Sequence, residues 1–260
     1  RDRYMRYNEL TFQGRNAVLE AFRSGKTIDK LFILDGCQDG PIKSIVREAK
    51  KTDAIINYVD KERLDRLAGT GHHQGVVAIG AAYEYAEVED ILAAAKEKGE
   101  DPFIFILDEI EDPHNLGAII RTANLAGAHG VIIPKRRAVG LTATVAKTSA
   151  GAINYTPVAK VTNISQTIEE LKKQGLWFVC ADMGGETMYN LNLKGPIGLV
   201  IGNEGNGVSR LVKDKCDFIA SIPMKGDIDS LNASVAAGVL AYEICLLYTS
   251  PSPRDRTRSR

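Results

Sequence analysis

Residues 198–244 read GLVIGNEGNGVSRLVKDKCDFIASIPMKGDIDSLNASVAAGVLAYEI, and this stretch decides the fold. Two short apolar runs, 197–201 at its start and 218–222 within it, each lead into a polar loop. A helix rich in small residues follows the second loop. Because ligands of open α/β sheets bind just outside the carboxyl ends of the strands, we expect a ligand site where these two loops meet.

The composition is that of a soluble globular protein. The chain has 260 residues, 44% hydrophobic and 25% charged, with no apolar run near the roughly 20 residues that a membrane span needs. The formal net charge is zero: the last ten residues carry four Arg and one Asp (+4 − 1 = +3), so the other 250 sum to −3. Any binding of nucleic acid must therefore come from local basic patches.

The cysteines and histidines indicate neither a disulfide framework nor a metal site. The cysteines are far apart in sequence and form no C-x-x-C pair, which predicts reduced, mostly buried thiols in a cytoplasmic protein. The adjacent His72 and His73 have no third ligand nearby, so we expect no metal. The cysteines are Cys37, Cys180, Cys216 and Cys245.

The chain divides by pattern into four parts. Residues 7–80 alternate helix and strand signals in a compact α/β module, and residues 81–101 are an acidic, Ala-rich linker with a short helix. A larger domain, 102–245, alternates regularly, which predicts a parallel sheet covered by helices on both faces. The Ser/Pro/Arg-rich end, 246–260, is interpreted as a foreign or disordered tail.

The expected elements follow from these patterns. In the larger domain the strands are 103–107, 130–133, 155–161, 176–181, 197–202 and 217–222, and the helices are 115–127, 141–151, 164–174, 207–215 and 229–245. In the smaller module the helices are 16–22, 41–50 and 62–67, and the strands are 30–34, 54–59 and 75–80.

One expected helix carries two candidate functional residues. Asp112 before Pro113 suits an N-cap followed by proline at the first helical position. Asn115 lies in the first turn, and Arg121 falls outside the apolar stripe, so Arg121 is either a surface residue or a functional one. The stripe has the i, i+3, i+4, i+7 spacing and consists of Leu116, Ile119, Ile120 and Ala123.

Three further segments lie next to strand ends. The cations of 135–137 are placed for phosphates, or are simply solvated. The glycine turn 202–207 lacks the Lys-Ser/Thr ending of a P-loop and the order of the dinucleotide fingerprint. It is either a tight strand-to-helix turn or a place where backbone approaches a ligand. In 230–234, Ser230 or Asn232 caps the last helix.

In order and spacing, these motifs resemble the SpoU (TrmH-like) family of RNA ribose 2′-O-methyltransferases, over about 102–245. The smaller module resembles that family's substrate-binding domain, which points to the branch that methylates a guanosine in bacterial 23S rRNA. The matching motifs are Asp112-Pro113-x-Asn115-x-Gly117-x-x-x-Arg121-Thr122-Ala123, Ile201-Gly202-x-Glu204-Gly205-x-Gly207, and Ile222-Pro223-Met224 with Ser230-Leu231-Asn232-x-Ser234.

The resemblance implies an α/β fold with a deep C-terminal trefoil knot (the SPOUT class), a homodimer, S-adenosylmethionine as cofactor and a 23S rRNA substrate. It implies catalytic roles for Arg121, Asn115, Glu204, Asn232 and Ser234, with Arg121 acting on the ribose 2′-hydroxyl as base or as electrostatic activator. It places the cofactor against Gly202, Ile222, Leu231, Gly207 and Met224, and RNA against Arg15, Asn16, Lys135, Arg136 and Arg137.

Three other hypotheses remain from the sequence. The chain is a tRNA ribose methyltransferase, a non-catalytic RNA-binding or antibiotic-shielding module, or a Rossmann-type methyltransferase. The smaller module disfavours the tRNA enzyme. The glycine motif of a Rossmann-type methyltransferase normally opens its domain, whereas only 260 − 207 = 53 residues follow Gly207.

Overall fold

The computed structural model of the chain describes residues 10–69 and 71–247. The chain divides into two compact units, residues 1–84 with 140–147 and residues 85–139 with 148–260, which are described separately. Of the tail expected at 246–260, Leu246 ends the last helix, Leu247 is its C-cap, and residues 248–260 lie outside the described residues. The first three residues of the module expected at 7–80 also lie outside them. Among the described helices, none combines the length and the hydropathy needed to cross a membrane.

The N-terminal unit is built on a mixed four-stranded sheet in the order β1-β4-β2-β3. Strands β2 and β3 are parallel, and β4 pairs antiparallel with both β1 and β2. Buried side chains of helices α2 and α3 form one core cluster on the sheet, and α4 contributes to a second. The elements are β1 (Thr11–Gln13), α2 (Arg15–Arg23), β2 (Ile28–Leu34), α3 (Gly40–Ala49), β3 (Ile55–Val59), α4 (Lys61–Ala68) and β4 (Val76–Gly80).

Side-chain caps explain where two of these helices begin. The carboxylate of Asp39 accepts a hydrogen bond from the backbone N–H of Ile42, and that of Asp60 accepts one from Arg63. The expected helices and strands of this unit are confirmed, apart from end residues. Strand β1 was not predicted, because three residues are too few to show an alternating pattern.

The C-terminal unit is built on a six-stranded sheet in the order β10-β8-β9-β5-β6-β7. Every neighbouring pair in it is parallel, which confirms the predicted parallel α/β class. The strands are β5 (Phe103–Asp108), β6 (Gly130–Pro134), β7 (Val158–Val161), β8 (Trp177–Thr187), β9 (Ile197–Gly202) and β10 (Phe218–Ser221). The helices are α5 (Val88–Lys98), α6 (Pro113–Leu125), α8 (Ile164–Lys173), α9 (Arg210–Lys213) and α10 (Ala233–Leu246), with 3₁₀ turns at Ala152–Asn154 and Met188–Asn190. Helix α7 (Ala143–Thr148) belongs, through Lys147, to the N-terminal unit.

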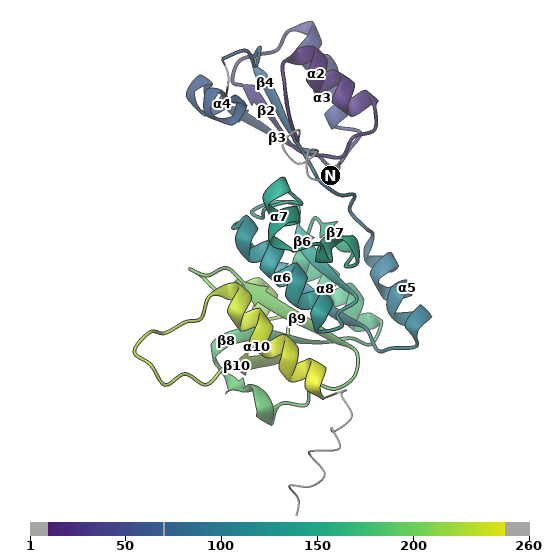
Figure 1. The fold of residues 1–260 in the computed structure, drawn as a ribbon, viewed down its shortest axis with the longest axis vertical. Helices are drawn as coiled ribbons and strands as arrows, with labels where there is room; N and C mark the ends of the chain where they lie inside the picture. Colours follow the sequence, from purple (N-terminus) through teal and green to yellow (C-terminus); the bar gives the residue numbers. More distant parts are fainter. Residues whose placement is uncertain (1–9, 70, 248–260) are drawn as a thin grey trace, which may run out of the picture. The chain divides into compact units, whose positions relative to one another are not determined.

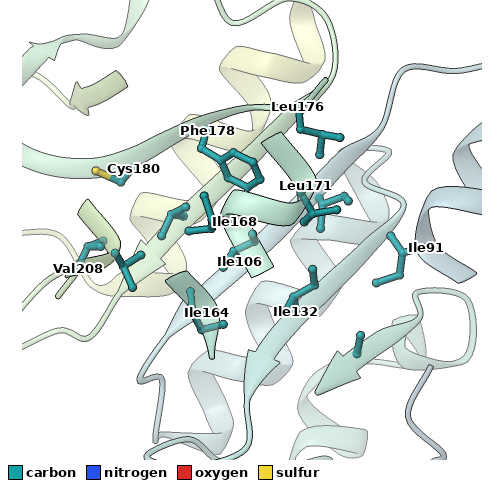
Figure 2. Close-up of a cluster of buried hydrophobic side chains, with 14 residues drawn as sticks. Ile91, Ile106, Ile132, Ile164, Ile168, Leu171, Leu176, Phe178, Cys180 and Val208 are labelled. Carbon is teal, nitrogen blue, oxygen red and sulfur yellow. The ribbon is translucent and has the colours of Figure 1, made fainter. Parts of the chain in front are cut away.

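Helices cover both faces of this sheet. On one face, side chains of α5, α8 and α9 pack with alternate residues of the strands in a single apolar cluster, shown in Figure 2. On the other face α6 and α10 pack against each other, and α10 also contacts β8 and β9 (Figure 1). Ile91 of α5 is fully buried in the cluster, so the helix within the expected linker packs as an element of this unit. Two covered faces explain why the strands read as continuous apolar runs.

Strand β8 leaves the sheet midway and then returns to it. Val179 and Cys180 pair with Phe218 and Ile219, but the next residues of β10, Ala220 and Ser221, pair with Glu186 and Thr187. Residues 181–185 therefore form a large bulge at the carboxyl end of the sheet. Bulges of this kind re-aim side chains next to functional sites.

Several predicted boundaries were too generous. The helix expected at 207–215 is only Arg210–Lys213, because the preceding turn closes on itself. The helix expected at 141–151 ends at Thr148, and the strand expected at 155–161 begins only at Val158. The last helix begins at Ala233 rather than 229 and ends at Leu246.

The prediction of mostly buried cysteines was wrong. Cys180 is buried, whereas Cys37, Cys216 and Cys245 are partly exposed, and no disulfide joins the four. Each of the partly exposed cysteines lies near the end of an element, where the sequence pattern does not determine burial.

Candidate functional site

A cavity of about 360 Å³ lies at the carboxyl ends of β8, β9 and β10. Its walls come from the bulge of β8, the glycine turn after β9, the loop after β10 and the first turn of α10. It lies where the sequence predicted a site, at the meeting of two strand-end loops. The lining residues are Ala181, Asp182, Met183, Ile201, Gly202, Asn203, Glu204, Gly205, Asn206, Gly207, Ala220, Ile222, Met224, Ser230, Leu231, Ala233 and Ala236.

All five residues expected at the cofactor line this one cavity. They come from two loops that lie on either side of it, and they offer mainly backbone groups and apolar side chains. Glu204 and Ser230 also line it, so the second and third motifs converge on the same space. The five are Gly202, Gly207, Ile222, Met224 and Leu231.

The glycine turn closes by backbone pairing. Asn203 N–H donates to the carbonyl of Gly207 at 3.1 Å, and Gly207 N–H donates to that of Asn203 at 2.8 Å. A Cβ at Gly202 would lie 2.1 Å from the carbonyl carbon of Gly207 and 2.2 Å from the nitrogen of Val208. A side chain at Gly202 would therefore clash with the turn that folds back onto it, which supports the first of the two interpretations of this segment, a tight turn.

Asn232 connects three distant parts of the chain. Its side-chain amide donates to Asn115 Oδ1 of α6 at 3.0 Å and to the carboxylate of Glu204 in the glycine turn. Its Oδ1 accepts from the backbone of Ser234 (3.0 Å) and Val235 (3.3 Å), so Asn232 is the N-cap of α10. Ser234 Oγ donates to the same Oδ1 at 2.5 Å. The structure thus joins four of the five expected catalytic residues.

Replacing Asn232 should destabilise the fold as well as the site. Asn232→Ala removes the cap of α10, takes the amide donor away from Asn115 and leaves Glu204 only the N–H of Ala233, so we expect the free energy of unfolding to fall by about 1–2 kcal/mol. Asn232→Ser keeps a capping oxygen and should recover part of that loss. Denaturant unfolding of the two variants measures the difference; equal stability of the alanine variant and the unmodified chain would contradict this role.

An ion pair borders the cavity on the side of β8. Lys213 of α9 donates to the carboxylate of Asp182, which lowers the pKa of Asp182 and raises the pKa of Lys213. A carboxyl group with a lowered pKa stabilises the fold above its unfolded pKa and loses that contribution as pH falls through the folded one. Since the unperturbed pKa is 3.8, the pair is formed throughout the neutral range.

Asp182, Asn203 and Asp108 were not predicted from the sequence. Asp182 follows an expected strand directly, so the strand-end rule applied to 176–181 would have found it. Asn203 Nδ2 donates to the carbonyl of Glu109 at 3.0 Å, and the buried Asp108 accepts from Ser209 N–H at 2.7 Å. These two hydrogen bonds attach the turn after β9 to the end of β5. They join residues about 100 positions apart, so the local sequence pattern could not predict them.

Arg121 stands apart from this network. It is exposed on α6, six residues and about 9 Å along the helix axis from Asn115. Within the described residues its guanidinium makes no hydrogen bond or ion pair, and it does not line the cavity. The helix itself is as predicted: Asp112 caps it, Pro113 is its first residue, and the expected apolar stripe is buried.

The expected RNA-binding residues occupy two places. Residues 135–137 follow β6, at the same edge of the sheet as the cavity; Arg137 pairs with Glu109 at 3.2 Å, and Arg136 is exposed. Arg15 and the exposed Asn16 begin α2 in the N-terminal unit. Arg15 pairs with Asp39 at 2.5 Å and donates through Nε to the carbonyl of Gln74 at 3.2 Å, so it also ties two loops together.

No group of three His, Cys, Asp or Glu side chains in 10–69 and 71–247 is arranged to hold a metal ion. His73 is buried, with Nε2 2.7 Å from Asp65 and Nδ1 accepting from Gly75 N–H at 3.0 Å, so both ring nitrogens are already engaged.

Comparison with known proteins identifies the family. Residues 102–242 match the SpoU rRNA Methylase family, and residues 13–86 match the RNA 2′-O ribose methyltransferase substrate-binding domain. YacO of Bacillus subtilis (strain 168), whose name places it among TrmH family tRNA/rRNA methyltransferases, is 53% identical over 89% of this chain and 93% of its own length. A Staphylococcus haemolyticus protein of the same family name is 49% identical over 91% and 95%.

Solved structures share the fold. An AdoMet-bound rRNA methyltransferase from Sinorhizobium meliloti has a TM-score of 0.57 and 23% identity, covering 94% of this chain and 90% of its own. A TrmH/SpoU tRNA modifying enzyme from A. aeolicus has a TM-score of 0.51 and 27% identity, covering 61% of this chain and 77% of its own. The chain therefore belongs to the SpoU (TrmH) family of RNA methyltransferases.

Proposed function

We propose that the chain methylates the ribose 2′-hydroxyl of a guanosine in 23S rRNA, in the cytoplasm. The observation that carries this proposal is the convergence of the family's motifs on one site. The second and third motifs line a single cavity, and Asn232 links them to Asn115 of the first motif. The cavity can hold a cofactor, and the hydrogen-bonded side chains around Asn232 adjoin it, where they can bind the ribose that accepts the methyl group.

The cavity fits S-adenosylmethionine. Its volume lies within the usual range for small-molecule sites, and Ile201, Ala220, Ile222 and Leu231 give it an apolar lining. The turn and loop backbones supply hydrogen-bonding groups beside these side chains, so adenine and the polar ends of the cofactor both find partners. When bound, the cofactor supplies an electrophilic methyl group on a sulfonium.

The chain's own task is to position and activate the hydroxyl. We propose that Arg121 stabilises developing negative charge on the 2′-oxygen, because a guanidinium scarcely deprotonates in proteins and so serves poorly as a base. Asn115, Glu204, Asn232 and Ser234 would orient the ribose. The basic residues assigned to the RNA phosphates are Arg15, Lys135, Arg136 and Arg137, with Asn16 beside them.

The two-unit organisation favours rRNA over tRNA. The solved relative titled an rRNA methyltransferase covers 94% of this chain, whereas the one titled a tRNA modifying enzyme covers only 61%. The chain also matches a substrate-binding domain over residues 13–86. A tRNA ribose methyltransferase remains the second candidate, because the names of the curated relatives include both substrates.

A transfer assay distinguishes the two. The protein is incubated with labelled S-adenosylmethionine and, separately, with 23S rRNA, 16S rRNA and bulk tRNA, and each RNA is digested to nucleosides. We expect label in 2′-O-methylguanosine from 23S rRNA alone. Label on a base, or in tRNA only, would overturn the substrate assignment.

We further propose that the C-terminal unit is tied in a deep trefoil knot. Strand β9 lies between β5 and β8, both of which precede it in the chain. Strand β10 then pairs with the outer side of β8, and α10 returns across the sheet to α6 (Figure 1). A crystallographic trace of residues 181–246 tests the threading.

We also propose a homodimer formed through α10. Val235, Tyr242 and Leu246 are 49%, 42% and 61% exposed, and their spacing places them on one face of that helix. We expect light scattering to give the mass of two chains, and Tyr242→Glu to give one. Leu211→Glu, a similar change at an exposed leucine of α9, should stay dimeric. A monomeric unmodified protein would contradict the proposal.

A further inference from the structure

A second cavity, of about 400 Å³, lies in the N-terminal unit between α3 and β3. We call it the α3–β3 groove. Strand β3 is an edge strand of the sheet of that unit, and helix α3 packs against the sheet (Figure 1). The lining residues are Cys37, Gln38, Ile42, Lys43, Val46, Arg47, Lys50 and Tyr58.

Three cations follow one face of α3 along this groove. Lys43 and Arg47 of α3 and Lys50, its C-cap in a helical conformation, are spaced i, i+4, i+7, so they occupy one side of the helix over about 10 Å. All three are exposed, and none pairs with an acidic side chain within the described residues. The lining contains no acid, and nearby Asp39 is already paired with Arg15. The groove is therefore a concentrated positive surface in a chain of zero net charge.

An aromatic ring lies opposite these cations. Ile56 packs in the cluster beneath α3, and Val59 packs in the cluster on the α4 side of the sheet. Because side chains alternate along a strand, Tyr58 shares the α3 side with Ile56. Tyr58 is 57% exposed, so its ring is accessible to a ligand. Proteins bind single-stranded nucleic acid with a row of cations that contacts its sugar-phosphate backbone and an exposed aromatic ring on which a base stacks.

We propose that the α3–β3 groove binds a single-stranded segment of the substrate RNA. Lys43, Arg47 and Lys50 contact successive phosphates, and Tyr58 stacks on an unpaired base. The ligand is an RNA strand rather than a duplex, because a base within a helix has no free face for the ring. This inference rests on the proposed function, since it gives the substrate of the same enzyme a second point of attachment.

The test measures binding of the full chain to a 23S rRNA transcript. The combined variant Lys43→Ala, Arg47→Ala, Lys50→Ala should bind the RNA more weakly. Its plot of log affinity against log salt concentration should be less steep by about 2, because each lost phosphate contact to a single strand contributes roughly 0.7 to the steepness. Tyr58→Ala should weaken binding roughly tenfold with little change in that slope, and Tyr58→Phe should restore it, because stacking needs the ring and not the hydroxyl.

A matched control removes three cations from the other side of the same sheet. Lys61→Ala, Arg63→Ala, Arg66→Ala on α4 changes the net charge equally, but none of these residues lines the groove. It should leave the affinity near that of the unmodified chain. Equal losses in both triple variants, or a Tyr58→Ala protein that binds normally, would overturn the proposal.

The outcome is separable from that of the proposed function. Methyl transfer is measured on the same preparations: if the unmodified chain transfers no methyl group to RNA, the proposed function fails whatever the groove does. If it methylates 23S rRNA and the groove variants show unchanged RNA affinity and KM, only the groove assignment fails.

Discussion

The variant Arg121→Ala is expected to lose roughly 100- to 1,000-fold in turnover, the cost of removing one fixed charge from a developing oxyanion. The guanidinium is exposed and makes no ion pair with a described side chain, so its loss should leave the melting temperature unchanged. RNA affinity should fall only slightly, because one arginine among many contacts is removed. Single-turnover methyl transfer at saturating RNA and cofactor measures the chemical step directly.

Two controls define this result. Arg210→Ala removes an arginine that is 95% exposed on α9 and should keep full turnover. Arg121→Lys keeps the positive charge but lacks the planar guanidinium, so it should have more activity than Arg121→Ala and less than the unmodified chain. Loss of RNA affinity in parallel with turnover would instead make Arg121 a binding residue, and unchanged turnover would exclude it from the reaction. A chain that only binds or shields RNA has no turnover to lose.

The variant Gly202→Ala is expected to weaken cofactor binding strongly. Its Cβ would lie 2.1 Å from the backbone of Gly207, so the turn must move away from the end of β9. That movement withdraws Glu204 from Asn232 and reshapes the cavity wall. We expect the affinity for S-adenosylmethionine to fall at least roughly 100-fold, equivalent to about 2.7 kcal/mol. Titration calorimetry measures it.

Gly205→Ala is the matched control in the same turn. A Cβ at Gly205 meets only Asn203 Oδ1, at 3.4 Å, and Gly205 does not have a positive φ. Its N–H bond to Asn203 survives the change. This variant should bind the cofactor nearly as the unmodified chain does. If both variants bound S-adenosylmethionine equally well, the close approach of the Gly207 backbone would not explain why position 202 is a glycine.

The sequence predicted the class of the fold because the physics involved is local. Regular alternation of apolar runs and helical patterns gives a parallel sheet, and the pair Asp112-Pro113 marks the start of α6 correctly. It also predicted the place of the cavity, since strand-end loops of a parallel sheet must meet at one edge. The names of the cofactor and the substrate class came from the family resemblance.

Long-range geometry was beyond the sequence patterns. Asn232 meets Asn115 across 117 residues, and only the folded backbone brings them within hydrogen-bond distance. The detour of β8 that delivers Asp182 depends on its pairing with β10, which no local period encodes. The α3–β3 groove was also missed, because cations spaced along a helix resemble an ordinary solvated face until Tyr58 is found beside them.

The most direct test of the central claim is a map of ribose methylation on 23S rRNA from cells with and without the gene. A 2′-O-methyl group protects the adjacent phosphodiester from alkaline cleavage, because the 2′-hydroxyl is the nucleophile of that cleavage. We predict one guanosine that is protected only when the gene is present, restored by the unmodified gene and not by Arg121→Ala. Identical maps from the two strains, or a difference confined to tRNA, would contradict the account.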